Sequence, residues 1–429
     1  MKTDKTKIVV AGGGHGGLAA AALLARKGFD VTVFEAQAEE AMGYDWCDCI
    51  RMSCFDRTGL ERPNDEWLTP MKAISYYNPR KSVCIRTGTQ DSSVSFVIER
   101  KLLLRHLIAL ARGSGAKLCF SRRVLSAVTQ GDRVVGVLTE TGEVRADIVI
   151  DAAGMDSPVR RSLPAGCGIQ REIDASDTLF TYRALFEDTG TASDMPAYSA
   201  YFCHLGVEGF DWVIRETDHV DVLIGAFGGL SEEMIRNAVD DFKRDHPYIG
   251  DQILRGGSCS RIPVRRTLPK FVCDGYAAIG DSAAMIEPLS GSGMTLSIRS
   301  AGFLADAIEQ AQDCSTASLW SYESAYFRSN LSLILRQQTL KDVMHCLGAR
   351  NIDTLFEKQM VTVKDFTSGK QTSSDLLHKV TGAVSAPSML PVFAEMLLRS
   401  RKQKKLLRTL PQDYSYAHVL RWIDDYDRF

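Results

Sequence analysis

Hydrophobic positions change their spacing twice between residues 7 and 34. Residues 7–11 form a short β-branched run that predicts a strand, and residues 18–27 are rich in alanine and leucine with the periodicity of a buried helix. Gly28 is expected to end this helix, and residues 30–34 form a second apolar run that predicts another strand. The sequence therefore predicts a strand–helix–strand unit whose first turn is rich in glycine.

Helical and strand-like patterns alternate farther along the chain. Residues 99–111 have the periodicity of an amphipathic helix, and residues 146–163 predict a strand that runs into a glycine turn. Residues 273–308 predict a strand, glycine turns and a long helix. Residues 176–264 contain alternating runs such as "LFTYRALF" and "FDWVIRET", which predict antiparallel strands with one buried face. Residues 346–429 are expected to be mainly helical.

Three glycines in the first predicted turn, Gly12, Gly14 and Gly17, have the spacing G-x-G-x-x-G. Such glycines permit a tight turn, close approach of the backbone to a pyrophosphate, and close packing of helix against strand. Glu35 ends the second predicted strand, where a carboxylate can accept hydrogen bonds from the two hydroxyls of an adenosine ribose. The pattern predicts a dinucleotide site, with a purely structural glycine turn as the alternative, and His15 is expected in the loop beside the cofactor.

Length and charge narrow the class of protein. With 429 residues, the chain is long enough for more than one hydrophobic core, so we expect at least two domains. The formal net charge of −2 gives no overall attraction to nucleic acid, and no nucleic-acid partner is expected. The sequence shows no secretory leader and no apolar segment of about 18 residues, from which we expect a cytoplasmic protein.

Eleven cysteines are scattered along the chain. Without a secretory leader, reduced thiols are expected rather than a disulfide framework. Cys47, Cys49 and Cys54 lie close together in the sequence, but no second group at zinc spacing accompanies them. We therefore assign no metal site and expect thiols of the core or of a pocket.

Four segments, in order, resemble the p-hydroxybenzoate hydroxylase-like FAD-dependent oxidoreductase superfamily, and most closely its geranylgeranyl reductase family. They are the glycine motif, the helix that opens with Arg100, the 146–163 segment and the 273–308 segment, and they span about residues 5–310. The resemblance implies an α/β fold with a Rossmann-like FAD-binding domain of the glutathione reductase type. It also implies an inserted antiparallel β-sheet substrate domain, a helical C-terminal region, and FAD as the cofactor.

The resemblance assigns four further residues to the cofactor. Gly280 and Asp281 match a pair whose carboxylate contacts the ribityl chain of FAD. Arg100 matches an arginine at the phosphate and ribityl region, and Val124 matches a position that meets adenine through its backbone. These roles are what the family implies for this sequence.

A proline and two glycines follow the Gly-Asp pair. Pro288, Gly291 and Gly293 match a family loop whose amides face the flavin pyrimidine at the N-terminus of a helix. The positive end of that helix stabilises the negative charge of a reduced flavin.

One motif departs from the family, because the usual Ala-Asp-Gly is replaced by Ala-Ala-Gly at residues 152–154. In the hydroxylases that aspartate lies near the route of NADPH, so its loss weakens the case for direct reduction by NADPH.

The motifs also divide the chain into three expected parts. The FAD-binding domain is expected to be discontinuous, because the sheet-like segments interrupt its motifs. The expected parts are the FAD-binding domain at 1–75, 100–175 and 265–345, the substrate-binding β-sheet domain at 76–99 and 176–264, and the helical C-terminal region at 346–429.

Two stretches favour the reductases within the superfamily. "GFDWVIRE" resembles the aromatic strand that lines the substrate cavity in geranylgeranyl reductases, through Phe210 and Trp212, although it lacks that strand's final proline. Cys47 follows Gly43 at roughly the spacing of a family cysteine beside the flavin, with Cys49 as a competing candidate. Core positions are the alternative for the indole and the thiols. The resemblance implies Cys47 as the catalytic candidate and a pocket lined by Phe210, Trp212 and Pro288.

The leading hypothesis is an FAD-dependent oxidoreductase that reduces a carbon–carbon double bond of an apolar, isoprenoid or polycyclic substrate by hydride transfer from flavin N5. The alternative is an FAD-dependent monooxygenase that hydroxylates an aromatic or other small molecule through a flavin C4a-hydroperoxide. A halogenase ranks third, because the tryptophan pair of that family is absent and Lys72 is only the nearest lysine candidate. A flavin-binding protein without turnover is the alternative from another class.

The reductant and the cellular partners are less constrained by the sequence. Electrons are expected from NAD(P)H or from a separate electron carrier, which would make an electron-donor protein a partner. A basic segment at residues 399–408 lies on a predicted helix with leucines between the charges. Such a segment can make peripheral contact with an anionic membrane, or it can be a solvated helix face.

Overall fold

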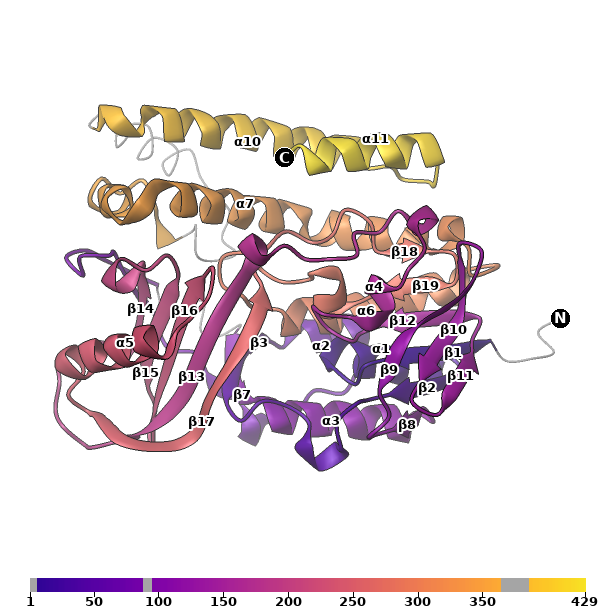
Figure 1. The fold of residues 1–429 in the computed structure, drawn as a ribbon, viewed down its shortest axis with the longest axis horizontal. Helices are drawn as coiled ribbons and strands as arrows, with labels where there is room; N and C mark the ends of the chain where they lie inside the picture. Colours follow the sequence, from indigo (N-terminus) through magenta and orange to yellow (C-terminus); the bar gives the residue numbers. More distant parts are fainter. Residues whose placement is uncertain (1–5, 88–94, 364–385) are drawn as a thin grey trace.

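A six-stranded sheet carries the glycine-rich turn in the computed structural model, which describes residues 6–87, 95–363 and 386–429 (Figure 1). The strand order is β18–β19–β12–β1–β2–β8. All neighbouring pairs are parallel except β18–β19. The bounds are β1 Lys7–Ala11, β2 Asp30–Phe34, β8 Lys117–Cys119, β12 Ile148–Asp151, β18 Val272–Cys273 and β19 Tyr276–Ala278. Parallel strands need long crossover connections, so the sheet collects segments that are far apart in the sequence.

Helix α1 (His15–Arg26) follows β1 and begins earlier than the predicted residue 18. Gly14 is the extended residue before the helix, and its carbonyl already accepts the Leu18 N–H at 2.9 Å. Of the three motif glycines, Gly17 therefore lies in the first helical turn, while Gly12, with φ +102°, and Gly14 form the turn before the helix. Gly28 follows the helix with φ +90°, a left-handed conformation that suits glycine, and the predicted end is confirmed.

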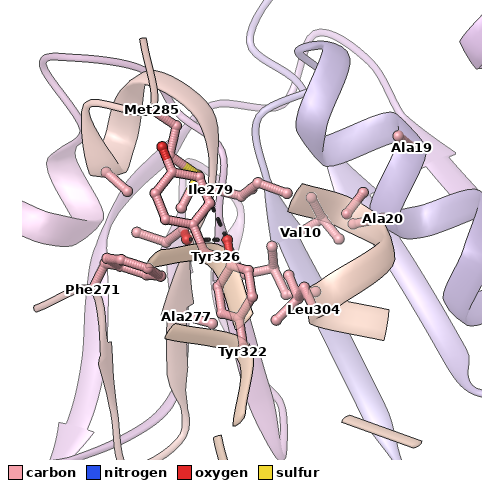
Figure 2. Packing of buried hydrophobic residues seen from close by; sticks show 14 of the residues in the cluster. Val10, Ala19, Ala20, Phe271, Ala277, Ile279, Met285, Leu304, Tyr322 and Tyr326 are labelled. Atoms are coloured by element: carbon pink, nitrogen blue, oxygen red, sulfur yellow. Dashed lines mark hydrogen bonds between the residues drawn. The ribbon is translucent and has the colours of Figure 1, made fainter. Parts of the chain in front are cut away.

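Helices and tyrosines close the core around this sheet. The helices α3 (Arg100–Gly113), α6 (Met294–Gln310) and α7 (Thr316–Glu357) pack with α1 or with one another beside it. Figure 2 shows Val10 of β1 and Ala20 of α1 near Leu304 of α6, with Tyr322 of α7 beneath them. The Tyr322 hydroxyl donates a hydrogen bond to the Ala278 carbonyl at 3.0 Å, so its polar atom is satisfied inside the core.

A seven-stranded sheet forms the second part of the fold. Its order is β17–β13–β16–β15–β14–β5–β6, and β14–β5 is its one parallel pair. The bounds are β5 Ser75–Tyr77, β6 Cys84–Arg86, β13 Thr178–Asp188, β14 Tyr198–Phe202, β15 Phe210–Arg215, β16 Val220–Phe227 and β17 Ile249–Pro263. The predicted strands of residues 176–264 are therefore present, and all but one pairing are antiparallel.

The expectation that only one face of these strands is buried is wrong for β14 and β16, which are buried along almost their whole length. A helix missed in the sequence, α5 (Glu232–Asp245), is the reason on one side, because its Phe242 packs on Val213 and Val222 of the sheet. On the other side Phe202 joins a cluster with residues of α7. The middle of the sheet is thus covered on both faces.

Two three-stranded sheets and several short helices complete the first part of the fold. One sheet has the order β3–β7–β4 and the other the order β11–β10–β9. The bounds are β3 Cys47–Arg51, β4 Thr69–Pro70, β7 Ser95–Glu99, β9 Val124–Gln130, β10 Arg133–Thr139, β11 Gly142–Arg145, α2 Ser53–Thr58 and α4 Pro158–Arg161. Strand β3 brings the cysteine-rich segment to the boundary between the two large sheets.

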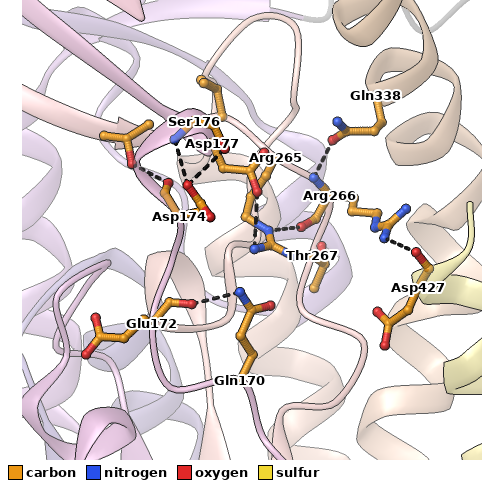
Figure 3. A network of polar contacts seen from close by, with 12 residues as sticks. Gln170, Glu172, Asp174, Ser176, Asp177, Arg265, Arg266, Thr267, Gln338 and Asp427 are labelled. Atoms are coloured by element: carbon orange, nitrogen blue, oxygen red, sulfur yellow. Dashed lines mark hydrogen bonds and ion pairs between the residues drawn. The ribbon is translucent and has the colours of Figure 1, made fainter. Parts of the chain in front are cut away.

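Long helices cover one side of the molecule. Helix α7 is kinked at Gly348, which has φ +64°, and α10 (Leu390–Thr409) and α11 (Tyr416–Asp427) lie along its outer side (Figure 1). Figure 3 shows how the segment before β18 attaches to them: the Arg266 N–H donates to Gln338 of α7 at 2.6 Å, and the Arg266 guanidinium donates to the Asp427 carbonyl of α11 at 3.1 Å. Of the helices that the structure describes, none is long and apolar enough to span a membrane.

Residues 1–5, 88–94 and 364–385 lie outside the described part, and so do the predictions made for them.

Candidate functional site

A cavity of about 430 Å³ lies between the six-stranded sheet and the seven-stranded sheet. The turns that follow β1, β12 and β19 line one part of it, and β13 to β16 line another. In open parallel sheets, ligands bind beyond the carboxyl ends of the strands. Predicted site residues that line the cavity are Gly14, Gly17, Cys47, Arg100, Phe210, Trp212, Gly280, Asp281, Gly291 and Gly293.

The other predicted site residues do not line the cavity. Glu35 accepts the Gly13 N–H at 2.7 Å, and its backbone carbonyl accepts the Arg122 N–H at 2.8 Å. That bond places the start of β9, with the buried Val124, close to the end of β2. Pro288 is buried between two residues that line the cavity, Glu287 and Leu289. The predicted contacts of Val124 with adenine and of Pro288 with substrate stay predictions.

The glycine turn is packed too tightly for side chains at two positions. A Cβ atom on Gly12, which has φ +102°, would lie 2.4 Å from the Ala152 carbonyl oxygen. A Cβ atom on Gly17 would lie 2.4 Å from the Gly12 carbonyl oxygen. A Cβ atom on Gly14, by contrast, would meet its nearest neighbour at 3.8 Å. The turn therefore crosses the 152–154 segment closely and leaves free space beside Gly14.

Glu35 holds this turn through both carboxylate oxygens, because Oε2 accepts from the Gly13 N–H at 2.7 Å and Oε1 accepts from the Gln37 N–H at 2.8 Å. Glu35→Ala is expected to weaken FAD binding roughly 10-fold, since it removes the acceptor for the Gly13 amide and for the ribose. Titration of the apoprotein with FAD, followed by quenching of flavin fluorescence, measures this. Glu40→Ala, an exposed carboxylate of the same loop, is the control. Equal affinity in Glu35→Ala and the wild type would contradict the ribose assignment.

The 280–293 loop is fixed by a residue that the sequence did not single out. Glu287 is buried, and its carboxylate accepts from Arg51 at 2.8 Å and from Gln337 at 3.1 Å. Its backbone bonds to Ser292 and Gly291, which closes the loop on itself. Helix α6 begins directly afterwards, so its N-terminus lies at the cavity wall.

A buried aspartate supports the segment in which the family motif lacks its own aspartate. The Asp151 carboxylate accepts from the Ser157 hydroxyl at 2.6 Å, the Tyr276 hydroxyl at 2.8 Å and the Ser282 hydroxyl at 3.0 Å. The Arg160 guanidinium donates to the Ser282 carbonyl at 2.6 Å. These bonds hold the turns after β12 and β19 together without a carboxylate at position 153.

Four alternating charges connect α3 with the seven-stranded sheet at the cavity. The Arg183 guanidinium donates to Asp48 at 2.8 Å and to Asp221 at 2.9 Å, and Arg100 donates to the other oxygen of Asp48 at 2.8 Å. Burial alone would raise the pKa of Asp48, but the two arginines outweigh it and lower that pKa below its ordinary value. The chain of charges fixes Arg100, a predicted cofactor residue, relative to β13 and β16.

Aromatic rings enclose the central arginine of this chain. The Arg183 guanidinium lies 4.9 Å from the Trp212 ring centroid and 5.3 Å from that of Trp46. Trp46 in turn stacks on Tyr44 at 4.6 Å, and Tyr44 lies 4.9 Å from the Arg100 guanidinium. Trp212 therefore lines the cavity with one part of its surface and packs on a buried cation with another.

The cysteines of β3 are protonated thiols. Burial, together with the charge of Glu99, raises the pKa of Cys47 far above its ordinary value, and burial with the charge of Asp48 raises that of Cys49 to about 12. A thiol with a raised pKa is a poor nucleophile. Cys47 lines the cavity, but it is not prepared to act as a thiolate.

The residues around the cavity fit FAD. Space beside Gly14 at the start of α1 suits a pyrophosphate, since helix N-terminal amides bind anions. Two buried nitrogens at this wall, His15 Nε2 and Arg100 Nε, have no hydrogen-bond partner within the described protein. Burial and the charge of Arg100 lower the pKa of His15 to about 3, so its imidazole is neutral and only a weak base. Gly14, Arg100 and Asp281 would hold the cofactor.

The sequence is similar to known FAD-binding proteins. Residues 5–192 match the family of FAD binding domains. Among more specific relatives, the digeranylgeranylglycerophospholipid reductase of Methanothrix thermoacetophila is 26% identical over 368 residues, which cover 81% of this chain and 90% of that enzyme. Digeranylgeranylglycerophospholipid reductase 1 of Methanopyrus kandleri is 27% identical over 393 residues, covering 86% and 96%.

Solved structures show the same fold. A geranylgeranyl bacteriochlorophyll reductase-like protein of Thermoplasma acidophilum superposes with a TM-score of 0.74 at 20% identity and covers 92% of this chain and all of its own. The probable FAD-dependent monooxygenase PqsL of Pseudomonas aeruginosa superposes with a TM-score of 0.59 at 20% identity and covers 82% of this chain. The protein is an FAD-dependent oxidoreductase with a mixed α/β FAD-binding fold. The predicted resemblance to the p-hydroxybenzoate hydroxylase-like superfamily and its geranylgeranyl reductases is confirmed.

Proposed function

We propose that the protein reduces carbon–carbon double bonds of an isoprenoid lipid. The observation that carries this proposal is that relatives named digeranylgeranylglycerophospholipid reductases align with it over 81% to 86% of its length, well beyond the FAD-binding domain. An aromatic wall formed by Phe202, Phe210 and Trp212 supports it, because apolar chains bind to such surfaces. The monooxygenase alternative rests on similar folds at lower TM-scores.

We propose that the two large sheets have different roles, one in binding the cofactor and the other in binding the substrate. In this proposal the segments 1–75, 100–175 and 265–345 bind FAD, and the segment 176–264 forms the substrate side together with β5 and β6 of the segment 76–99. Strand β7, at the end of the segment 76–99, pairs with β3 and β4 on the FAD side. Helices α10 and α11, in the described part of the C-terminal region, cover the other flank beside α7. The cavity spans the boundary between the first two parts, so that a substrate on the aromatic wall faces the Gly291–Gly293 loop.

Reduced FAD supplies a hydride at N5 when it is bound. The 287–293 loop and the N-terminus of α6 line the cavity, where their backbone amides and the helix dipole would stabilise negative charge on a reduced flavin. Arg100, held by Asp48, would help to orient the cofactor. Cys47 is the proposed catalytic residue of the substrate side: its sulfur keeps its proton at the cavity wall and shapes the pocket. The reductant is NAD(P)H or a separate electron-carrier protein, and Ala153 at the place of the family aspartate favours the carrier.

The decisive experiment is an anaerobic turnover assay. The FAD-loaded protein is reduced with dithionite and mixed with a geranylgeranylated glycerophospholipid, and the product is examined by mass spectrometry. Two hydrogens are expected to be added per reduced double bond, without any need for O2. Cys47→Ala is expected to retain FAD and to lose turnover, while Cys84→Ala, an exposed thiol on β6, serves as the matched control. Substrate-dependent O2 consumption with oxygen incorporated into the product would instead establish the monooxygenase.

The C-terminal helix offers a surface for peripheral membrane contact, which we propose as the route to a lipid substrate. Leu397 and Leu398 are 39% and 52% exposed, and the exposed Arg401, Lys404 and Arg408 follow them on α10. Apolar and cationic side chains on one helix suit the interface of an anionic membrane. Other basic residues of the 399–408 segment bind within the protein, such as Lys405 with Asp425 at 2.8 Å.

Vesicle sedimentation tests this contact. The wild type is expected to bind phosphatidylglycerol vesicles more tightly than phosphatidylcholine vesicles, because each cation near an anionic surface contributes about 1 kcal/mol. The triple variant with alanine at positions 401, 404 and 408 is expected to bind phosphatidylglycerol vesicles roughly 100-fold or more weakly than the wild type does. Its affinity for phosphatidylcholine vesicles should change little. A variant with alanine at Arg123 and Arg145, exposed on the other part of the molecule, is the control. Equal binding of the wild type to both vesicles would refute the contact.

A further inference from the structure

Two cysteines outside the cavity lie in direct contact. Cys167 ends a short 3-10 turn (Ala165–Cys167), Cys273 ends β18, and their sulfur atoms are 2.8 Å apart. Each residue is 2% exposed, although 106 residues separate them in the sequence. Disulfides have a sulfur separation of about 2.05 Å, so the two sulfur atoms already lie within about 1 Å of bonding distance. None of the cofactor or substrate residues proposed above belongs to it.

Hydrogen bonds give the two thiols different roles. The Cys273 thiol donates to the Cys167 sulfur, and the Lys270 ammonium donates to the Cys167 carbonyl at 2.7 Å. The hydrogen bond from Cys273 lowers the pKa of Cys167, and the charge of Lys270 acts in the same direction. The same contact and burial raise the pKa of Cys273. Cys167 is therefore the more nucleophilic sulfur, and Cys273 is placed to react second.

The position of Cys167 near the surface provides access for a small oxidant. The turn that it ends is three residues long, and its neighbours Ala165, Gly166 and Gly168 are exposed. Gly168 has φ +62°, which suits glycine and lets the chain reverse directly after the cysteine. Short surface turns open locally at low cost, and such an opening exposes Cys167 without disturbing the sheet.

We propose that Cys167 and Cys273 are a dithiol that hydrogen peroxide converts to an intramolecular disulfide. The Cys167 thiolate attacks one peroxide oxygen, the O–O bond breaks, and the departing hydroxide takes a proton to form water. The Cys273 sulfur then attacks the sulfenic sulfur of Cys167, and the S–O bond breaks to release a second water. Two electrons pass from the thiols to the peroxide, and one S–S bond is the product.

The disulfide would tie two segments that support the cofactor turns. The Cys167 turn follows α4, whose Arg160 bonds to the Ser282 carbonyl next to Asp281. Strand β18 pairs with β19, which leads into the same Gly280–Asp281 turn. Oxidation therefore closes a covalent loop around this region of the FAD-binding fold. A cross-link of this kind stabilises the native state mainly by restricting the unfolded chain.

Peptide mapping tests the proposal on the FAD-loaded protein. The reduced protein is treated with hydrogen peroxide, remaining thiols are alkylated, and the chain is digested with trypsin. Cys167 and Cys273 fall in separate peptides with one cysteine each, residues 162–171 and 271–299. A disulfide-linked pair of these peptides, two hydrogens lighter than the sum, is expected. Cys167→Ser should abolish it, Cys84→Ser should not, and Cys273→Ser should leave a sulfenic acid on Cys167 that dimedone traps.

Thermal unfolding gives a second measurement. The oxidised wild type is expected to unfold roughly 3 °C or more above the reduced protein, a difference that Cys167→Ser or Cys167→Ala should remove. Recovery of both cysteines as alkylated thiols, after peroxide has oxidised the exposed Cys84 or Cys259, would overturn the proposal. Disulfides that join Cys167 only to other cysteines or to a second molecule would overturn it as well.

Discussion

Gly12→Ala is expected to yield a protein without FAD and with a much lower free energy of unfolding. Gly12 has φ +102°, and a Cβ atom there would lie 2.4 Å from the Ala152 carbonyl oxygen and 2.6 Å from its carbonyl carbon. Both contacts are with backbone, so no side-chain rotation relieves them. The combined cost of strain and displacement is about 3 kcal/mol or more. Flavin absorbance after desalting and chemical denaturation measure the two effects.

Two further variants separate loss of cofactor from loss of fold. Gly14→Ala adds a methyl group with 3.8 Å of clearance in the protein itself, so it should fold normally and lose affinity only for FAD. Gly113→Ala, at the end of α3 with no atom within 4 Å of the added Cβ, should change neither property. Full FAD content in Gly12→Ala would show that the turn has another conformation.

Arg183→Met is expected to lower the free energy of unfolding by about 3–5 kcal/mol, because it leaves the buried Asp221 carboxylate without its cation and the half-buried Asp48 carboxylate with one of its two cations. Asp221 would keep only a 3.4 Å contact with the Trp212 indole, and Asp48 would keep only Arg100. The indole would also lose the guanidinium at 4.9 Å, so the aromatic wall should shift. Urea denaturation followed by circular dichroism measures the loss. Lys117→Met, which breaks the exposed pair with Asp30, should cost less than about 1 kcal/mol.

The effect of Arg183→Met depends on pH in a defined direction. The folded pKa of Asp48 is lowered, so the carboxylate contributes stability that is present above its unfolded pKa of about 4 and is lost as the pH falls through the lower folded value. In Arg183→Met the unpaired carboxylates bind protons more readily than in the wild type. The stability difference between the two proteins should therefore shrink as the pH is lowered from 7 to 4. A difference that stays constant over this interval would contradict the assigned charge network.

Local patterns were sufficient for the parts of the fold that local forces determine. The predicted strands at 7–11 and 30–34 are β1 and β2 with the same bounds. Their β-branched residues favour strands, and the glycines beside them end the runs. The signal for α5 was also present: Ser231 caps the helix by accepting the Met234 N–H, and two acidic residues follow. The alternating runs on either side led us to predict strands throughout residues 176–264, so the signal for the helix was missed.

The charge network could not be predicted, because its members meet only through tertiary structure. Arg183 lies 135 residues from Asp48 and 38 residues from Asp221. Its one sequence signal is a cation in an otherwise apolar alternating run, "LFTYRALF", where a buried partner is required. Glu287 and Asp151 had no comparable signal, since each acts on loops that other segments bring to it. The roles of Val124 and Pro288, which come from family resemblance alone, stay predictions.

The order of strands in the six-stranded sheet has a consequence for how the protein is made. Ile8 of β1 pairs with Ile148, and Val149 of β12 pairs with Tyr276, so the strands of these two pairs are more than 100 residues apart in the chain. Contacts of such long range form late and slow the folding of a domain. During synthesis, the glycine turn emerges early but has no completed sheet beside it until β19 has left the ribosome. The cofactor turns after β1, β12 and β19 therefore come together only after β19 has been translated, and the nascent chain must stay free of aggregation until then.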